Sequence, residues 1–89
     1  MSHKAGVYKL LGLARRAGAV APGTDAVRRA VLEGEAMLVL MAGDASSVQL
    51  DKVRKTLRDR TIPQVILGNR HTLGAAVGLG SLSAIAVTN

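Results

Sequence analysis

The sequence has no cysteine, tryptophan or phenylalanine, and Tyr8 is its only aromatic residue. Without thiols the chain can form no disulfide bond, offers no thiolate nucleophile and lacks the cysteine ligands of most structural zinc sites. With a single aromatic side chain it has no row of rings on which the bases of a nucleic-acid single strand could stack. These absences exclude a disulfide scaffold, a cysteine enzyme and a single-strand binder that works by stacking.

Long hydrophobic runs are also missing. The longest uninterrupted apolar stretch is Ala36–Ala42, which is far shorter than the roughly 20 residues that a membrane-spanning helix needs. Near the N-terminus no basic run precedes a long apolar stretch, as it would in a secretory signal. No amphipathic segment carries the bulky aromatic face that is typical of membrane-surface helices. We therefore expect a cytoplasmic chain without a membrane partner.

Acidic residues are scarce. Six Asp and Glu residues stand against twelve Lys and Arg residues, which gives a formal net charge of +6 and a pI near 10.9. Such an excess attracts polyanions, although an ordinary solvated basic surface has the same composition. The carboxylates show no paired spacing suited to acid–base catalysis, His71 has no predictable partner, and Ser46 and Ser47 have no histidine nearby. We expect no enzymatic activity, no metal site and no cofactor.

The residues that are present favour one α/β domain covering residues 1–89. Apolar residues make up 48% of the chain, and segments with helical spacing alternate with short strand-like runs. The expected helices are Lys4 to Ala17, Thr24 up to Gly34, a segment from Ser46 to before Thr61, and a short segment after Asn69. The expected strands are Ala19–Ala21, Met37–Met41, Val65–Leu67 and Leu82–Val87. This alternation predicts a three-layer α/β/α sandwich, while the strand order has no signal in the pattern.

Several local features follow from residue chemistry. Thr24 is expected to cap the second helix, and Ser46 with Gln49 to form a capping box at the third. The continuous apolar run Met37–Met41 predicts a central strand that is buried on both faces. The third helix is expected to bury Val48, Val53 and Leu57.

A candidate anion site lies where the turn Pro22–Gly23 leads into the second helix. The first N–H groups of a helix are free and the helix dipole is positive there, which suits a phosphate. Arg29 follows one turn later, and the arginine fork fits phosphates and guanine edges. Nine of the twelve basic residues fall into three groups: Arg15 with Arg16, Arg28 with Arg29, and Lys52, Arg54, Lys55, Arg58 and Arg60. We interpret the third group first as the solvated face of a helix and second as a diffuse attraction for phosphates.

Four segments of the sequence resemble a known family when taken in order. They are Leu10–Gly18, Pro22–Val31, Leu38–Ala45 and Leu73–Gly78. Together they are similar to the L7Ae/L30e ribosomal proteins, in particular to the short stand-alone bacterial members. The resemblance implies an α/β/α sandwich with a mixed four-stranded sheet, and a protein that binds structured RNA, commonly a kink-turn. It also implies a site at the start of the second helix and in the loop before the last strand.

The resemblance carries over to individual positions. The family pattern at the second helix is Gly-Thr-Asn-Glu followed by a lysine. Gly23 and Thr24 match it, Asp25 stands where Asn is usual, Ala26 replaces Glu, and Arg29 stands for the lysine. Arg28 is expected to approach phosphates or guanine together with Arg29. In the loop, the residues expected to wall the bulged nucleotides are Leu79, Gly80, Ser81 and Leu82.

Ala26 is the main departure from the family pattern. In the family the Glu accepts hydrogen bonds from guanine, and an alanine side chain accepts none. Either Asp25 substitutes in part, since a carboxylate accepts from guanine N1–H and N2–H, or it is a charge that only stabilises the helix start. We expect a monomer that binds a kink-turn, ribosomal RNA or the ribosome. The alternative is a protein-interaction module on the same scaffold that has lost sequence-specific RNA recognition.

Overall fold

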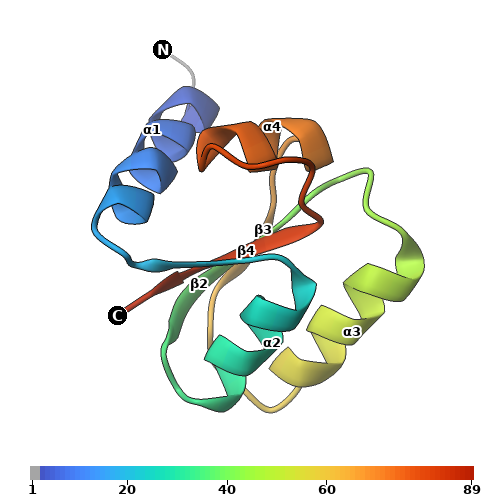
Figure 1. Cartoon of the computed structure of the whole chain (residues 1–89). Helices are drawn as coiled ribbons and strands as arrows, with labels where there is room; N and C mark the ends of the chain where they lie inside the picture. The colour runs from blue at the N-terminus through green and yellow to red at the C-terminus, as the bar shows by residue number, and fades with distance from the viewer. Residues whose placement is uncertain (1–2) are drawn as a thin grey trace.

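The computed structural model describes the backbone of residues 3–89 and the side chains of residues 6–89. The described residues form four helices and four strands that alternate along the chain, as predicted (Figure 1). The helices are α1 (His3–Arg16), α2 (Thr24–Leu32), α3 (Ser47–Leu57) and α4 (Arg70–Ala76). The strands are β1 (Val20–Pro22), β2 (Ala36–Met41), β3 (Gln64–Ile66) and β4 (Ala84–Thr88).

The strands form one mixed sheet in the order β1-β4-β2-β3. β4 pairs antiparallel with both β1 and β2, and β3 pairs parallel with β2. Helices α1 and α4 cover one face of this sheet, and α2 and α3 cover the other (Figure 1). The expected three-layer α/β/α sandwich with a mixed four-stranded sheet is confirmed.

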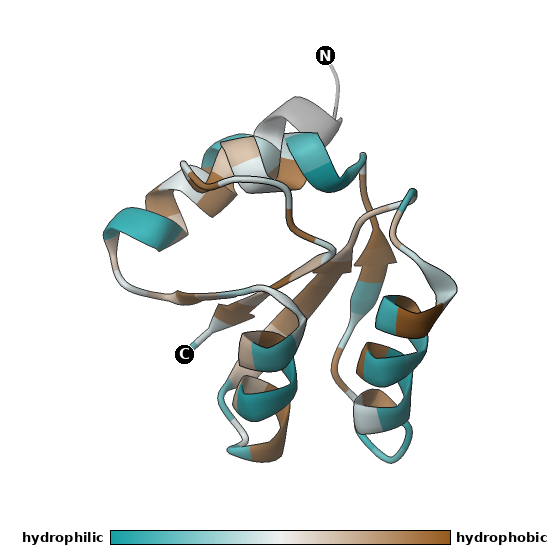
Figure 2. Ribbon diagram, turned by 45° about the vertical axis from the view of Figure 1, so that its right-hand side comes forward, coloured by the Kyte–Doolittle hydropathy of each residue, from teal (hydrophilic) through white to brown (hydrophobic). Residues whose placement is uncertain are grey.

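The core consists of two aliphatic layers, one on each face of the sheet. Successive residues of a strand point to opposite faces, so Val39 and Met41 of β2 pack toward α2 and α3, while Leu40 packs toward α1 and α4. Among the described residues no polar or charged side chain is buried. Figure 2 shows this division, with hydrophobic strands inside and hydrophilic residues along α2 and α3.

Two burial predictions were wrong. Val48 is 61% exposed, because it lies about 140° around the helix axis from Val53 and so falls on the outer face of α3. Met37 is 57% exposed, because the register of β2 with β4 shifts between Ala36 and Leu38 and leaves Met37 without a partner. Such a bulge turns its residue away from the regular pleat.

The helix caps also differ in part from the prediction. The N-cap of α2 is Gly23, and Thr24 is already the first residue of the helix. Ser46 accepts the N–H of Gln49, which is one half of a capping box. Asn69 and Thr72 form a complete capping box at α4. Since β4 begins at Ala84, two residues later than expected, Leu82 belongs to the preceding loop.

Candidate nucleic-acid interface

The start of α2 borders an open hollow with a volume of about 440 Å³. Three segments that are far apart in the sequence meet there: the β1–α2 junction, the first half of α3 and the loop before β4. The residues that line this α2 hollow are Pro22, Gly23, Thr24, Asp25, Ala26, Gln49, Lys52, Ser81, Leu82 and Ser83. Six of the sequence-predicted site residues therefore lie together, namely Gly23, Thr24, Asp25, Ala26, Ser81 and Leu82.

The backbone of Gly23 sets the geometry of the helix start. Its φ of 95° and ψ of 156° lie in a region that is essentially restricted to glycine. In this conformation its N–H donates to the carbonyl of Ala84 (2.9 Å), while its own carbonyl accepts the N–H of Val27 (2.9 Å). The turn is thereby held to the first residue of β4, and α2 begins at a fixed place beside the loop that leads into this strand.

The N-terminus of α2 has no side-chain cap, unlike those of α3 and α4. The backbone N–H groups of Thr24, Asp25 and Ala26 precede the first intrahelical donor, Val27, and so have no partner within the helix. All three residues line the α2 hollow. The positive end of the helix dipole is therefore available to an anion or to a hydrogen-bond acceptor.

The loop before β4 supplies an apolar wall. A Cβ added to Gly23 would lie 4.0 Å from Cδ2 of Leu82, which shows how closely the Leu82 side chain approaches the start of α2. Ser81 is exposed, whereas Leu82 is half-buried. Leu79 and Gly80 precede this wall and do not line the hollow, and Leu79 is 38% exposed.

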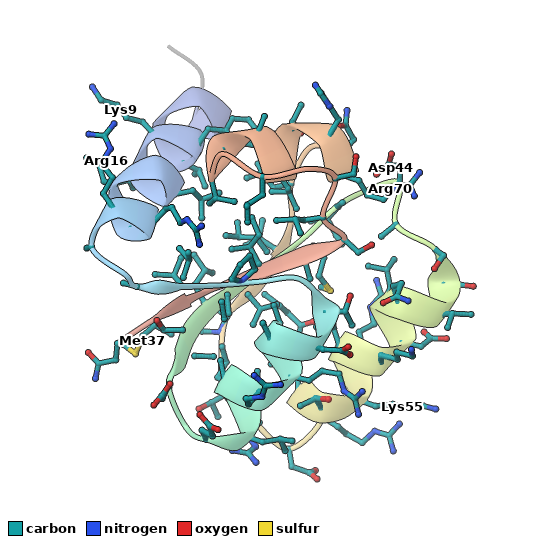
Figure 3. All side chains as sticks on the ribbon, in the orientation of Figure 1. Lys9, Arg16, Met37, Asp44, Lys55 and Arg70 are labelled. Atoms are coloured by element: carbon teal, nitrogen blue, oxygen red, sulfur yellow. The ribbon has the colours of Figure 1, made fainter. Side chains whose placement is uncertain are left out.

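A chain of contacts through Arg70 positions the loop. The N–H of Leu82 donates to the carbonyl of Arg70 (3.0 Å), and the N–H of Arg70 donates to Oδ1 of Asp44 (2.8 Å). The guanidinium Nε of Arg70 lies 3.5 Å from Oδ2 of Asp44 (Figure 3). The backbone hydrogen bond from Arg70, and then the charge of its side chain, hold the pKa of Asp44 below its ordinary value. An ionised Asp44 thus anchors the residue to which the loop is bound.

Gln49 and Lys52 reach the α2 hollow from α3. The sequence did not predict Gln49 as a site residue, and it placed Lys52 only within a group of basic residues on one helix face. The two residues are three positions apart and therefore share one face of the helix. That spacing was visible in the sequence, but the packing of α3 beside α2 was not. Lys52 brings a positive charge to the same hollow as the free N–H groups.

The arginines of α2 lie elsewhere. Arg28 Nε donates to the hydroxyl of Thr56 on α3 (3.2 Å) and so bridges the two helices. Arg29 is exposed and lines a neighbouring shallow hollow that also includes Pro22, Ala26 and Glu33. The two arginines therefore flank the α2 hollow rather than enter it.

Other functional groups are sparse in the described part of the chain. There, no group of three His, Cys, Asp or Glu residues lies close enough to hold a metal ion. His71 lines a shallow surface depression beside Tyr8 and Thr72, away from the α2 hollow. Within residues 3–89 no helix has both the length and the apolar character to cross a membrane.

Two known proteins are similar to this chain in sequence. RNA-binding protein YlxQ of Bacillus subtilis (strain 168) is 35% identical over 82 residues, which cover 92% of this chain and 82% of that protein. Large ribosomal subunit protein eL8 of Picrophilus torridus is 29% identical over 75 residues, which cover 83% of this chain and 59% of that protein.

Solved structures agree with the fold. A protein of unknown function from Bacillus halodurans superposes with a TM-score of 0.85 at 34% identity, covering 92% of this chain and 83% of its own. The 15.5kD RNA binding protein of Giardia lamblia shares the fold, with a TM-score of 0.80 at 22% identity over 93% of this chain and 71% of its own. Residues 5–89 match the ribosomal protein L7Ae/L30e/S12e/Gadd45 family, and the chain therefore belongs to this family.

Proposed function

We propose that this chain binds structured RNA, without catalysing a reaction, and that the α2 hollow is its binding site. The observation that carries the proposal is the uncapped N-terminus of α2, which meets Lys52 and the loop before β4 in one open hollow. Membership of a family of ribosomal proteins and the similarity to the RNA-binding protein YlxQ support it. The RNA is a kink-turn, in ribosomal RNA or in a transcript.

Each part of the hollow has a distinct chemical role in this proposal. The free N–H groups of Thr24, Asp25 and Ala26 donate to a phosphate oxygen or to a base acceptor. Lys52 neutralises a phosphate, and Leu82 packs against a bulged nucleotide. The chain has a single aromatic residue, so recognition depends on backbone shape and hydrogen bonds more than on base stacking.

Base recognition in the hollow falls to Asp25 and Gln49. Ala26 offers no side-chain acceptor, whereas the carboxylate of Asp25 and the amide of Gln49 line the same surface. Either group accepts hydrogen bonds from a guanine edge. Asp25 is exposed and therefore free to make this contact.

Two lysines of α3 provide a matched test of the site. Lys52 lines the α2 hollow, and Lys55 lies outside it on the same helix, exposed to solvent (Figure 3). Lys52→Gln and Lys55→Gln remove the same charge. We expect Lys52→Gln to weaken binding of a kink-turn RNA about fivefold, equivalent to roughly 1 kcal/mol, and Lys55→Gln to have a much smaller effect. Equal effects in a filter-binding titration would show that only overall charge matters.

Asp25→Ala separates the two roles of this carboxylate in the same assay. If Asp25 accepts from guanine, the substitution lowers affinity for the kink-turn by about 1–3 kcal/mol and leaves binding of a straight duplex unchanged. If Asp25 only stabilises the helix start, removing a negative charge beside the RNA leaves affinity for both RNAs unchanged or raises it. The second result would refute base recognition by Asp25.

A further inference from the structure

A groove lined only by apolar side chains runs between α1 and the sheet, and it shares no residue with the α2 hollow. Its volume is about 490 Å³. The residues that line it include Leu10, Leu13 and Ala14 of α1, Leu38 and Leu40 of β2, and Val87 of β4. This apolar groove is a second concave surface on the molecule. Its lining is apolar, whereas the α2 hollow is lined mainly by polar residues, including a lysine.

The groove exists because the helix layer leaves part of the sheet uncovered. α1 packs mainly against α4 and β1. Leu11 is buried in the same core as Leu40, so only the outer part of the apolar side of α1 is left open beside the sheet. Leu10 is 64% and Leu13 is 48% exposed. Val65 of β3 pairs with Leu40 in the sheet and therefore shares its face, where it is 45% exposed. Large apolar side chains that stay exposed around a groove are more typical of an interaction site than of ordinary protein surface.

The rim of the groove is basic. Lys9 precedes Leu13 by four residues and Arg16 follows it by three, so both lie beside Leu13 on the helix. Both are exposed and project from α1 (Figure 3). The sequence of α1 contains no acidic residue, and among the side chains that the structure describes the one ion pair joins Arg70 and Asp44 on another part of the surface. Neither rim cation is neutralised within the described chain.

We propose that the apolar groove binds an acidic amphipathic helix of another protein. The aliphatic side chains of the partner helix would fill the groove between Leu13 and Leu38, and the Asp or Glu residues of that helix would pair with Lys9 and Arg16. A second copy of this chain fits poorly, because it would bring the same cations and a net charge of +6 to the contact. RNA also fits poorly, since the groove has no polar group that could bind a base edge or a phosphate.

A pair of synthetic peptides tests this proposal. One peptide of about 15 residues, a length at which a helix becomes marginally stable, has leucines at helical spacing and glutamates beside them. Its partner has lysines in place of the glutamates. We expect the acidic peptide alone to shift the amide NMR signals of α1, β2 and the end of β4. Leu13→Gln should weaken binding of the acidic peptide about tenfold. Val48→Gln, at an exposed apolar position on α3 outside the groove, should not weaken it.

Other outcomes would overturn the proposal. Equal binding of both peptides would remove the role of Lys9 and Arg16, and no shift with the acidic peptide would leave the groove without this partner. Self-association that Leu13→Gln abolishes, measured by sedimentation equilibrium, would make a second copy the occupant. Displacement of the acidic peptide by a kink-turn RNA would assign the groove to RNA. The peptide result does not depend on whether the α2 hollow binds RNA.

Discussion

Gly23 is the residue on which the geometry of the α2 hollow depends. Its backbone conformation is essentially closed to residues with a side chain, and both its N–H and its carbonyl are engaged. A substitution here strains the turn whatever space surrounds it. The sequence predicted a turn at Gly23, and this glycine matches the family pattern. The absence of a side-chain cap at the start of α2 became visible only in the structure.

Gly23→Ala should therefore destabilise the fold. We expect a loss of about 1–3 kcal/mol in the free energy of unfolding, measured by urea denaturation, because the alanine must adopt a glycine-only conformation. Gly6→Ala is the matched control, since Gly6 is an exposed position in α1 with open space around it. Alanine has a higher helix propensity than glycine, so the Gly6→Ala variant should be as stable as the natural chain or more stable by up to about 1 kcal/mol. Equal losses in the two variants would contradict the conformational argument.

Asp44 should make the stability depend on pH in acid. Because the pKa of Asp44 is lower in the folded chain than in the unfolded one, ionised Asp44 stabilises the fold above its unfolded pKa. This contribution is lost as the pH falls through the lowered pKa. The Asp44→Asn variant lacks this stabilising contribution at every pH, because an amide does not ionise. The difference in unfolding free energy between the natural chain and Asp44→Asn should thus be constant above about pH 5 and shrink as the pH falls below about 4; a difference that stays constant in acid would refute the linkage.

At the scale of elements, helix and strand periodicity in the sequence predicted the order of the secondary structure. The bounds moved by only one or two residues in most elements, such as Gln64–Ile66 for the predicted Val65–Leu67. The strand order β1-β4-β2-β3 had no local signal, since it depends on pairing between distant segments. Gln49 and Lys52 escaped prediction for the same reason, because their place in the hollow results from packing between α2 and α3.

The contact between α4 and the following loop is another consequence of packing. A Cβ on Gly74 would collide with the carbonyl oxygen of Gly80, and the N–H of Leu79 donates to the carbonyl of Gly74 (2.9 Å). The loop therefore passes directly over α4 on its way to the α2 hollow. A side chain at this position would push Ser81 and Leu82 out of place.

Gly74→Ala tests that coupling. We expect a loss of about 1–3 kcal/mol of stability, typical of overpacking, together with weaker binding of a kink-turn RNA. Gly80→Ala is a control in the same loop, where an added Cβ meets nothing within 4 Å. Unfolding and RNA-binding titrations of both variants give the comparison. Full RNA affinity in a folded Gly74→Ala variant would show that the loop position is not needed for binding.

At the scale of the whole molecule, two surfaces of opposite character lie on different elements. The α2 hollow combines a free helix N-terminus with a lysine, and the apolar groove lies under α1 with a basic rim. The net charge of +6 favours association with a polyanion over self-association. One chain with these surfaces could hold RNA and an acidic protein partner at the same time.

The salt dependence of binding to a kink-turn RNA tests the central claim most directly. The logarithm of the association constant should fall linearly with the logarithm of salt concentration, by about 0.7–0.9 for each phosphate that the protein neutralises. Lys52→Gln should reduce this slope by nearly one. At every salt concentration the kink-turn should bind more tightly than a straight duplex of equal length. Binding that is independent of salt, or equal for the two RNAs, would contradict recognition of structured RNA by this chain.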